Sequence, residues 1–172
     1  MVTPTQGGGC VVDRLEALIE SIVEEDRRLR TLVDRLSPEA RERAESTGTT
    51  SAKETLGHLA FWDGFTVRFF EDRLSDRRTG SGLADFEARD RQERKRLRGC
   101  PFTEVLTTYD EATAGLVAFL REHWQALSDR EHADLITPLR HRRHHRLLLE
   151  RAIGAASLPG AGPPAREESG QA

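Results

Sequence analysis

Cysteine is scarce in this sequence of 172 residues, which contains only Cys10 and Cys100. One lies next to a glycine tract and the other beside Pro101. Because this is not the pattern of a disulfide framework, we expect both thiols to be reduced. Neither cysteine has a histidine close in sequence, no serine occupies a nucleophile elbow, and the glycine tract follows no strand. The sequence therefore predicts neither a covalent nucleophile nor a phosphate-binding loop.

Long apolar runs and an excess of one charge are also lacking. Apolar runs such as residues 147–149 are far shorter than the roughly 20 residues of a membrane-spanning helix. The first ten residues lack the cationic start of a secretory signal, so we expect a cytoplasmic location. The 26 Lys and Arg against 29 Asp and Glu give a net charge of -3. No overall field therefore favours nucleic acid or an anionic membrane.

Strand-like alternation is absent, whereas four long segments repeat apolar residues at intervals of three and four, which is typical of amphipathic helices. Ser37-Pro38 ends the first segment, a capping box at Ser51–Glu54 begins the second, and Thr137-Pro138 begins the fourth. The predicted helices cover residues 11–36, 51–74, 105–124 and 137–154. These features predict an all-α protein with a four-helix bundle.

The remaining segments set the predicted domain boundaries. The charge-dense residues 85–98 are interpreted as a short extra helix or lid between the second and third long helices. Residues 1–10 are predicted to form a flexible N-terminus and residues 157–172 a disordered tail, because both are rich in small or polar residues. The bundle is expected to span residues 11–156 as a single domain.

The candidate chemistry lies in the histidines. His141 and His145 are four positions apart on the fourth predicted helix, so they share one face, and that face continues into the apolar stripe. Three protein ligands and a water are typical of reactive metal sites, so a third ligand is needed from another helix. His58, at the edge of the apolar arc of the second helix, is the best candidate. The weaker candidates are His123 and His132.

The same part of the fourth helix allows a second interpretation. Residues 140–146 contain four arginines, so this stretch could instead be a basic face that binds an acidic partner. Arginines oppose a dication unless they face solvent or pair with acids. Arg142 and Arg143 are expected to lie away from the line of histidines, whereas Arg140 and Arg146 flank it.

Asp63 is expected on the buried arc of the second helix, where a carboxylate needs a partner. It is a candidate catalytic residue that orients a ligand histidine or accepts a proton; the alternative is an ion pair with an arginine of a neighbouring helix. Trp62, Phe65 and Phe69, joined by Tyr109 of the third helix, are predicted to line a pocket for an apolar substrate. Aromatic residues at helical spacing are also typical of a core.

Residues 51–63, SAKETLGHLAFWD, resemble the second-helix signature of the DinB-like superfamily. This superfamily includes the mycothiol-dependent maleylpyruvate isomerase relatives and the ClbS/DfsB group. Residues 141–146, HRRHHR, resemble its fourth-helix pattern, and residues 36–39 resemble its exit from the first helix. Two features depart from the family pattern: Thr50 replaces the usual tryptophan, and the link between the third and fourth helices is short.

The resemblance implies a four-helix bundle, commonly a homodimer, in which His58, His141 and His145 correspond to a triad that binds Zn, Ni, Fe or Mn. It also implies one of four functions: hydrolysis, isomerisation, thiol transfer, or protection against reactive natural products. We expect a metal-dependent hydrolase or thiol transferase that acts on a small molecule, with a low-molecular-weight thiol as a further candidate cofactor. The alternative is a metal-free small-molecule binding or self-resistance protein of the ClbS/DfsB type, which sequesters or opens its ligand.

Overall fold

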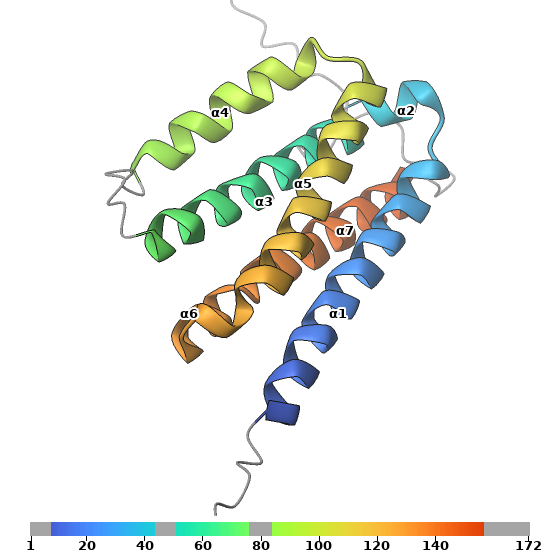
Figure 1. Cartoon of the computed structure of the whole chain (residues 1–172). Helices are drawn as coiled ribbons and strands as arrows, with labels where there is room; N and C mark the ends of the chain where they lie inside the picture. The colour runs from blue at the N-terminus through green and yellow to red at the C-terminus, as the bar shows by residue number, and fades with distance from the viewer. Residues whose placement is uncertain (1–7, 44–50, 76–83, 157–172) are drawn as a thin grey trace, which may run out of the picture.

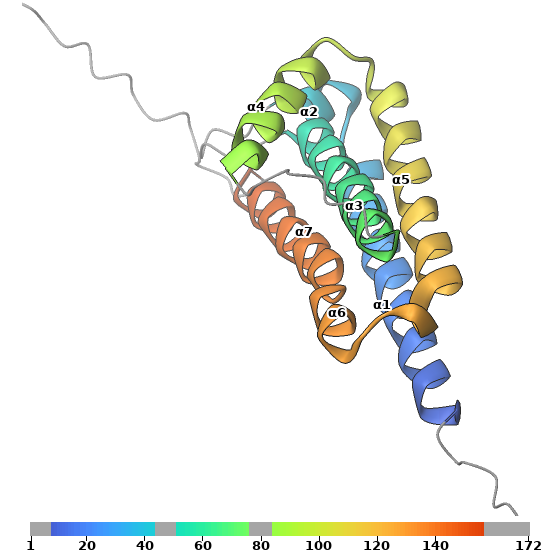
Figure 2. The ribbon, with the colours of Figure 1, turned by 60° about the vertical axis from the view of Figure 1, so that its left-hand side comes forward.

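Four long helices pack into a bundle in the computed structural model, which describes residues 8–43, 51–75 and 84–156 (Figures 1 and 2). They are α1 (Gly8–Asp34), α3 (Ala52–Leu74), α5 (Phe102–His123) and α7 (Thr137–Ala156). Shorter elements are α2 (Pro38–Glu42), α4 (Ala84–Arg98), the 3-10 turn η1 (Trp124–Ala126) and α6 (Asp129–Asp134). The described residues contain no strand, which confirms the all-α prediction. The predicted tail and the first seven residues lie outside the described ranges.

Side-chain caps fix where several helices begin. The Ser51 hydroxyl accepts a hydrogen bond from the Glu54 backbone N–H at 3.0 Å, and the Glu54 carboxylate accepts one from the Ser51 N–H at 3.2 Å. This reciprocal pair is the predicted capping box of α3. Ser128 and Glu131 form a second capping box at α6. The sequence analysis missed this short helix, and it also missed α2.

The apolar interior is divided into two clusters along the bundle. α3 packs mainly against α5, and α1 packs mainly against α7. One cluster contains Leu15, Leu18, Ile19, Ile22, Phe70, Leu116, Phe119, Leu120, Trp124, Leu127 and Leu135. The other contains Leu29, Val33, Ala52, Leu56, Leu59, Ala60, Leu97, Val105, Tyr109 and Leu149.

A layer of polar side chains separates the two clusters. Each long helix contributes to it at the position where its apolar residues pass from one cluster to the other. The members of this polar layer are Glu25 of α1, Asp63 of α3, Thr113 of α5, and Arg142 and Arg146 of α7. Buried charges are tolerated only when they are paired, so this layer constrains how the helices fit together.

The outer helix α4 is held close against the beginning of α3 (Figure 1). Leu97 of α4 is 0% exposed, and a Cβ atom built at Gly57 would lie 2.2 Å from one of its methyl groups. The buried Lys53 ammonium donates hydrogen bonds to the carbonyl oxygens of Arg98 and Cys100, at 3.3 and 3.2 Å. A glycine and a lysine of α3 therefore position α4, which is the predicted extra helix.

Replacing Gly57 with alanine should destabilise the protein by about 1–3 kcal/mol, because the added methyl group must displace Leu97 or move α4 outward. Urea unfolding measures this effect. Gly115 on α5 is the matched control, because a Cβ at that position meets no atom within 4 Å. An equal loss of stability in the two alanine variants would contradict the close approach of α4.

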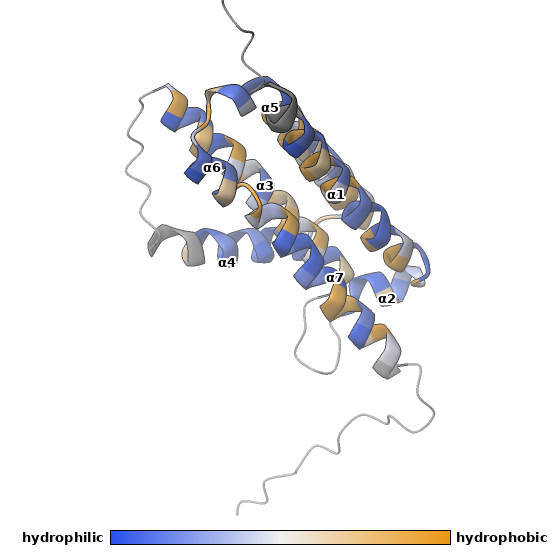
Figure 3. Ribbon diagram, turned by 90° about the horizontal axis from the view of Figure 1, so that it is seen from below, coloured by the Kyte–Doolittle hydropathy of each residue, from blue (hydrophilic) through white to orange (hydrophobic). Residues whose placement is uncertain are grey.

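The hydropathy of the helices follows this packing. Hydrophobic residues lie largely between the long helices, whereas α4 and the outer faces are hydrophilic (Figure 3). No described helix combines the length and the apolar character that crossing a membrane would require.

Candidate metal centre

The three predicted histidines come together between α3 and α7. His58 lies in the second turn of α3, and His141 and His145 lie one turn apart near the beginning of α7. The Nε2 atom of His141 is 3.1 Å from that of His58 and 3.0 Å from that of His145. One nitrogen from each ring can be chosen so that all three lie within 4.8 Å of one another. His58 is buried, and the other two rings are partly buried.

These distances suit a metal ion better than a set of hydrogen bonds. His141 Nε2 carries at most one proton, so it can donate a hydrogen bond to the Nε2 atom of either His58 or His145 but not to both. By contrast, nitrogen ligands bound tetrahedrally at about 2.0–2.1 Å lie roughly 3.3 Å apart, close to the spacing seen here. The donor set of three imidazoles is typical of Zn²⁺ and similar divalent ions. The residues present therefore fit the divalent metal that the sequence analysis expects.

Asp90 of α4 fixes the orientation of His58. Its Oδ1 atom lies 2.6 Å from His58 Nδ1, and its Oδ2 atom accepts a hydrogen bond from Arg94 at 2.9 Å. A carboxylate only accepts hydrogen bonds, so the proton of neutral His58 is on Nδ1 and the lone pair is on Nε2, facing His141. Sequence reasoning missed Asp90 because no pattern separates it from the other charges of α4.

Replacing Asp90 with asparagine should weaken zinc binding about 10–100-fold, the usual effect of losing the partner of a metal-bound imidazole. The amide no longer attracts the Nδ1 proton as a carboxylate does. Competition with a chromogenic chelator measures the affinity. Glu93→Gln is the matched control, because Glu93 lies on the same helix but pairs with Arg96. An unchanged affinity in Asp90→Asn would show that Asp90 does not orient the ligand.

The environment keeps the imidazoles neutral. Burial, reinforced by the neighbouring His58, lowers the pKa of His141 to about 4. Burial, together with His141, lowers the pKa of His145 to about 3. Burial also lowers the pKa of His58, although the Asp90 carboxylate opposes that shift. All three rings therefore present free lone pairs at neutral pH, as metal binding requires.

The lowered pKa values predict acid sensitivity when metal is withheld with a chelator. The unfolded chain binds protons at His141 and His145 below about pH 6.5, whereas in the folded chain their pKa values are about 4 and about 3, so stability falls as the pH drops from about 6.5 toward 4. We expect the melting temperature of the wild type to fall at least about 3 °C further between pH 7 and pH 5 than that of His145→Asn, a difference of roughly 1 kcal/mol. Scanning calorimetry measures both, and identical pH profiles would contradict the neutral cluster.

Asp63 forms an ion pair with an arginine of a neighbouring helix, which the sequence analysis gave as the alternative to a catalytic role. It is 2% exposed and forms a bidentate ion pair with Arg142, whose Nη1 atom donates to Oδ1 at 2.9 Å. Burial raises the pKa of Asp63 to about 6, and the Arg142 guanidinium opposes this shift. Arg142 also donates to the Thr113 hydroxyl at 2.9 Å. The structure thus places Asp63 in the polar layer, and the histidine cluster receives its carboxylate from Asp90.

The predicted substrate-binding aromatics divide into two groups. Trp62 packs edge to face against His141 at 5.9 Å between ring centroids. Phe65 follows Trp62 at 6.0 Å, and Phe69 follows Phe65 at 5.9 Å, which forms a partly exposed aromatic row that begins at the histidines. Tyr109 is not part of this row, because it is 0% exposed within the apolar cluster that also holds Leu56.

Two of the four arginines of the predicted basic face are turned inward. Arg142 is 0% exposed and pairs with Asp63. Arg146 is 7% exposed and donates at 2.6 Å to both Glu25 and Glu150. These pairings neutralise two of the four positive charges that would oppose a dication, and they remove half of the surface that an acidic partner would contact.

A family model of the DinB superfamily matches residues 12–156, and the chain belongs to this superfamily. The match includes α3, α5 and α7, all of α1 except its first four residues, and the three histidines. No curated protein and no solved structure gives a significant match. Membership in the superfamily establishes the fold, and it does not by itself assign a reaction.

Proposed function

We propose that this member of the DinB superfamily is a metal-dependent enzyme acting on a small molecule, with His58, His141 and His145 as ligands of one divalent ion. The observation that carries the proposal is the convergence of three neutral imidazoles, contributed by two helices, on one point. Three protein ligands leave a coordination position for water or substrate, which is the arrangement of reactive rather than structural sites. A metal bound there supplies Lewis-acid activation of a substrate oxygen, a water or a thiol.

The surrounding residues provide orientation and substrate contact. Asp90 holds the proton on His58 Nδ1, and Arg94 in turn holds Asp90. Trp62 packs against both His58 and His141, and the aromatic row leads from it along α3. A partly exposed row of rings favours a substrate with an aromatic or other flat apolar part, because such rings bind one another edge to face or offset-stacked.

The metal content of freshly purified protein tests this proposal. Elemental analysis should find close to one Zn, Ni, Fe or Mn per chain, and dialysis against a chelator should abolish turnover in a panel of ester, lactone and thiol-transfer substrates. Adding the metal back should restore the turnover. A protein that turns over such a substrate at full rate without stoichiometric metal would refute the proposal.

A further inference from the structure

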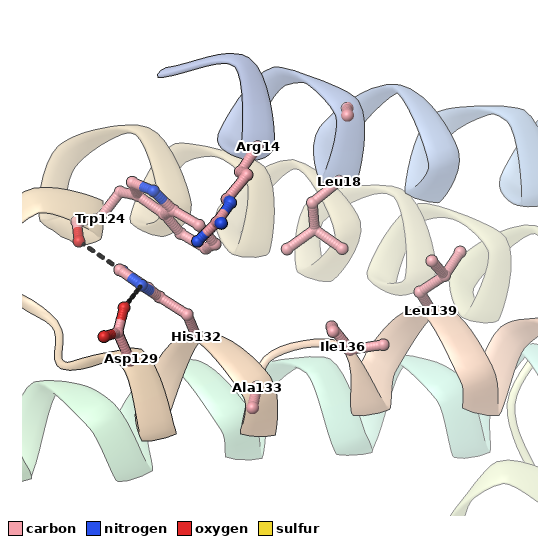
Figure 4. A pocket seen from close by; sticks show the side chains of 9 residues that line it. Arg14, Leu18, Trp124, Asp129, His132, Ala133, Ile136 and Leu139 are labelled. Carbon is pink, nitrogen blue, oxygen red and sulfur yellow. Dashed lines mark hydrogen bonds and ion pairs between the residues drawn. The ribbon is translucent and has the colours of Figure 1, made fainter. Parts of the chain in front are cut away.

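A cavity of about 550 Å³ lies on another side of the bundle, between the beginning of α1 and the segment formed by α6 and the start of α7 (Figure 4). Its walls are apolar. Leu18 projects from α1, Ile136 directly precedes α7, and Leu139 lies in the first turn of α7. Trp124 closes one end. Small-molecule sites occupy roughly 300–1,000 Å³ and are lined mainly by such side chains. The cavity is therefore large enough for a small organic ligand.

This cavity is separate from the candidate metal centre. Leu139, which lines it, and His141, a candidate ligand, are two positions apart on α7, and therefore about 200° apart around the helix axis. The cavity faces α1, whereas the histidines face α3. No residue of the aromatic row or of the polar layer lines it.

The charged group of the cavity that can hold an anion is Arg14. Figure 4 shows Arg14 reaching from α1 to lie beside the indole of Trp124, at the edge of the open space. Within the part of the chain that the structure describes, Arg14 has no carboxylate partner, unlike Arg27 and Arg28 farther along α1. The carboxylate that also lines the cavity belongs to Asp129, which is exposed like Arg14 but is directed at His132 Nδ1, 4.0 Å away. Among the described residues that line the cavity, Arg14 is the one with a full positive charge.

His132 makes the aromatic end of the cavity rigid. Its ring stacks on Trp124 at 3.9 Å with an interplanar angle of 18°, and its Nε2–H donates to the Trp124 carbonyl oxygen at 2.8 Å. The Nδ1 atom faces Asp129 at 4.0 Å. Because both ring nitrogens are directed at protein atoms, His132 shapes the wall and leaves the recognition of an anion to Arg14.

We infer that this cavity binds an amphipathic carboxylate, with the hydrocarbon part against Leu18, Ile136 and Leu139 and the carboxylate at Arg14. The apolar wall gives affinity by removing hydrocarbon from water. The guanidinium gives preference for an anionic head group through charge-assisted hydrogen bonds. The site is independent of the histidines, so it can serve as a second substrate subsite or as a regulatory site.

Octanoate and 1-octanol, which have equal chain length and differ in the head group, test the inference by isothermal titration of the full chain. Octanoate should bind with a Kd below about 1 mM, within the range of ligand efficiencies for molecules of this size. Arg14→Gln should weaken octanoate binding about tenfold and leave octanol binding unchanged, because only the charged contact is lost. Ala133→Phe, which fills the cavity, should weaken both.

Two controls separate this site from the metal centre and from a surface effect. Arg121→Gln removes an exposed arginine of α5 that does not line the cavity, and it should leave octanoate binding unchanged. A chelator should also have no effect, so the inference can hold even if the histidines bind no metal. Equal binding of octanoate and octanol to the wild type, or an unchanged octanoate affinity in Arg14→Gln, would refute the inference. A change of oligomeric state in Ala133→Phe without a change in octanoate affinity would show instead that the cavity is a subunit interface.

Discussion

Replacing Asp63 with alanine should lower the free energy of unfolding by about 3–5 kcal/mol, because the buried guanidinium of Arg142 loses its counter-charge. Arg142 is 0% exposed, so its guanidinium is shielded from bulk water. The Thr113 hydroxyl remains as a partner, but it is neutral and accepts only one hydrogen bond from the guanidinium. Urea unfolding followed by circular dichroism measures the loss.

The matched control is Glu24→Ala, which breaks ion pairs with Arg27 and Arg28 on the exposed face of α1. Exposed pairs of this kind contribute about 0–1 kcal/mol. A second variant, Asp63→Leu with Arg142→Met, removes both charges and should be more stable than Asp63→Ala, because no unpaired charge is left in the interior. If Asp63→Ala and Glu24→Ala lose equal stability, the ion pair at Asp63 is not buried as described.

Replacing His141 with alanine should weaken zinc binding by more than about 100-fold, beyond the effect of removing a partner outside the ligand set. His141 is the central ring of the cluster, since its Nε2 atom lies within 3.1 Å of the Nε2 atoms of both His58 and His145. Its loss leaves two nitrogens and one more position open to water. Competition with a chromogenic chelator and elemental analysis measure affinity and stoichiometry.

The neighbouring His144 gives a control of the same residue type on the same helix. Its ring is exposed, and it is not among the residues that could share the ion. His144→Ala should therefore bind zinc as the wild type does. Equal losses in the two variants would indicate non-specific binding to a histidine-rich helix. Full stoichiometric binding by His141→Ala would remove the basis of the proposed function.

Much of the fold could be predicted from the sequence because the relevant signals are local. The Ser51–Glu54 capping box and the helical spacing of apolar residues depend on neighbours within a few positions, and both are confirmed. The Ser128–Glu131 pair carries the same capping signal. The helix that follows has only 6 residues and no apolar repeat, so the sequence pattern alone does not indicate it.

The histidine cluster was predictable for a similar reason, whereas its supporting residues were not. A spacing of four places His141 and His145 on one face, and His58 stands on an apolar arc. The contact of Asp90 with His58 depends on how α4 docks, and its position within a charge-dense segment gives no signal. Arg142 was expected away from the histidine line, but the sequence did not indicate that its pairing with Asp63 would bury it. Contacts between segments that are distant in the sequence determine the positions of both Asp90 and Arg142.

The polar layer also has a consequence for alignment along the bundle axis. Sliding α7 past α3 by one turn, about 5.4 Å, would separate the Arg142 guanidinium from the Asp63 carboxylate and leave Arg142 beside apolar residues of α3. The pairing of Arg142 with Asp63, together with that of Arg146 with Glu25, therefore specifies one axial position of α7. His141 and His145 lie on either side of Arg142 in the sequence of α7. The axial position of α7 therefore also determines where their rings meet His58. The Arg142–Asp63 ion pair, which lies outside the candidate ligand set, therefore helps to align the three imidazoles.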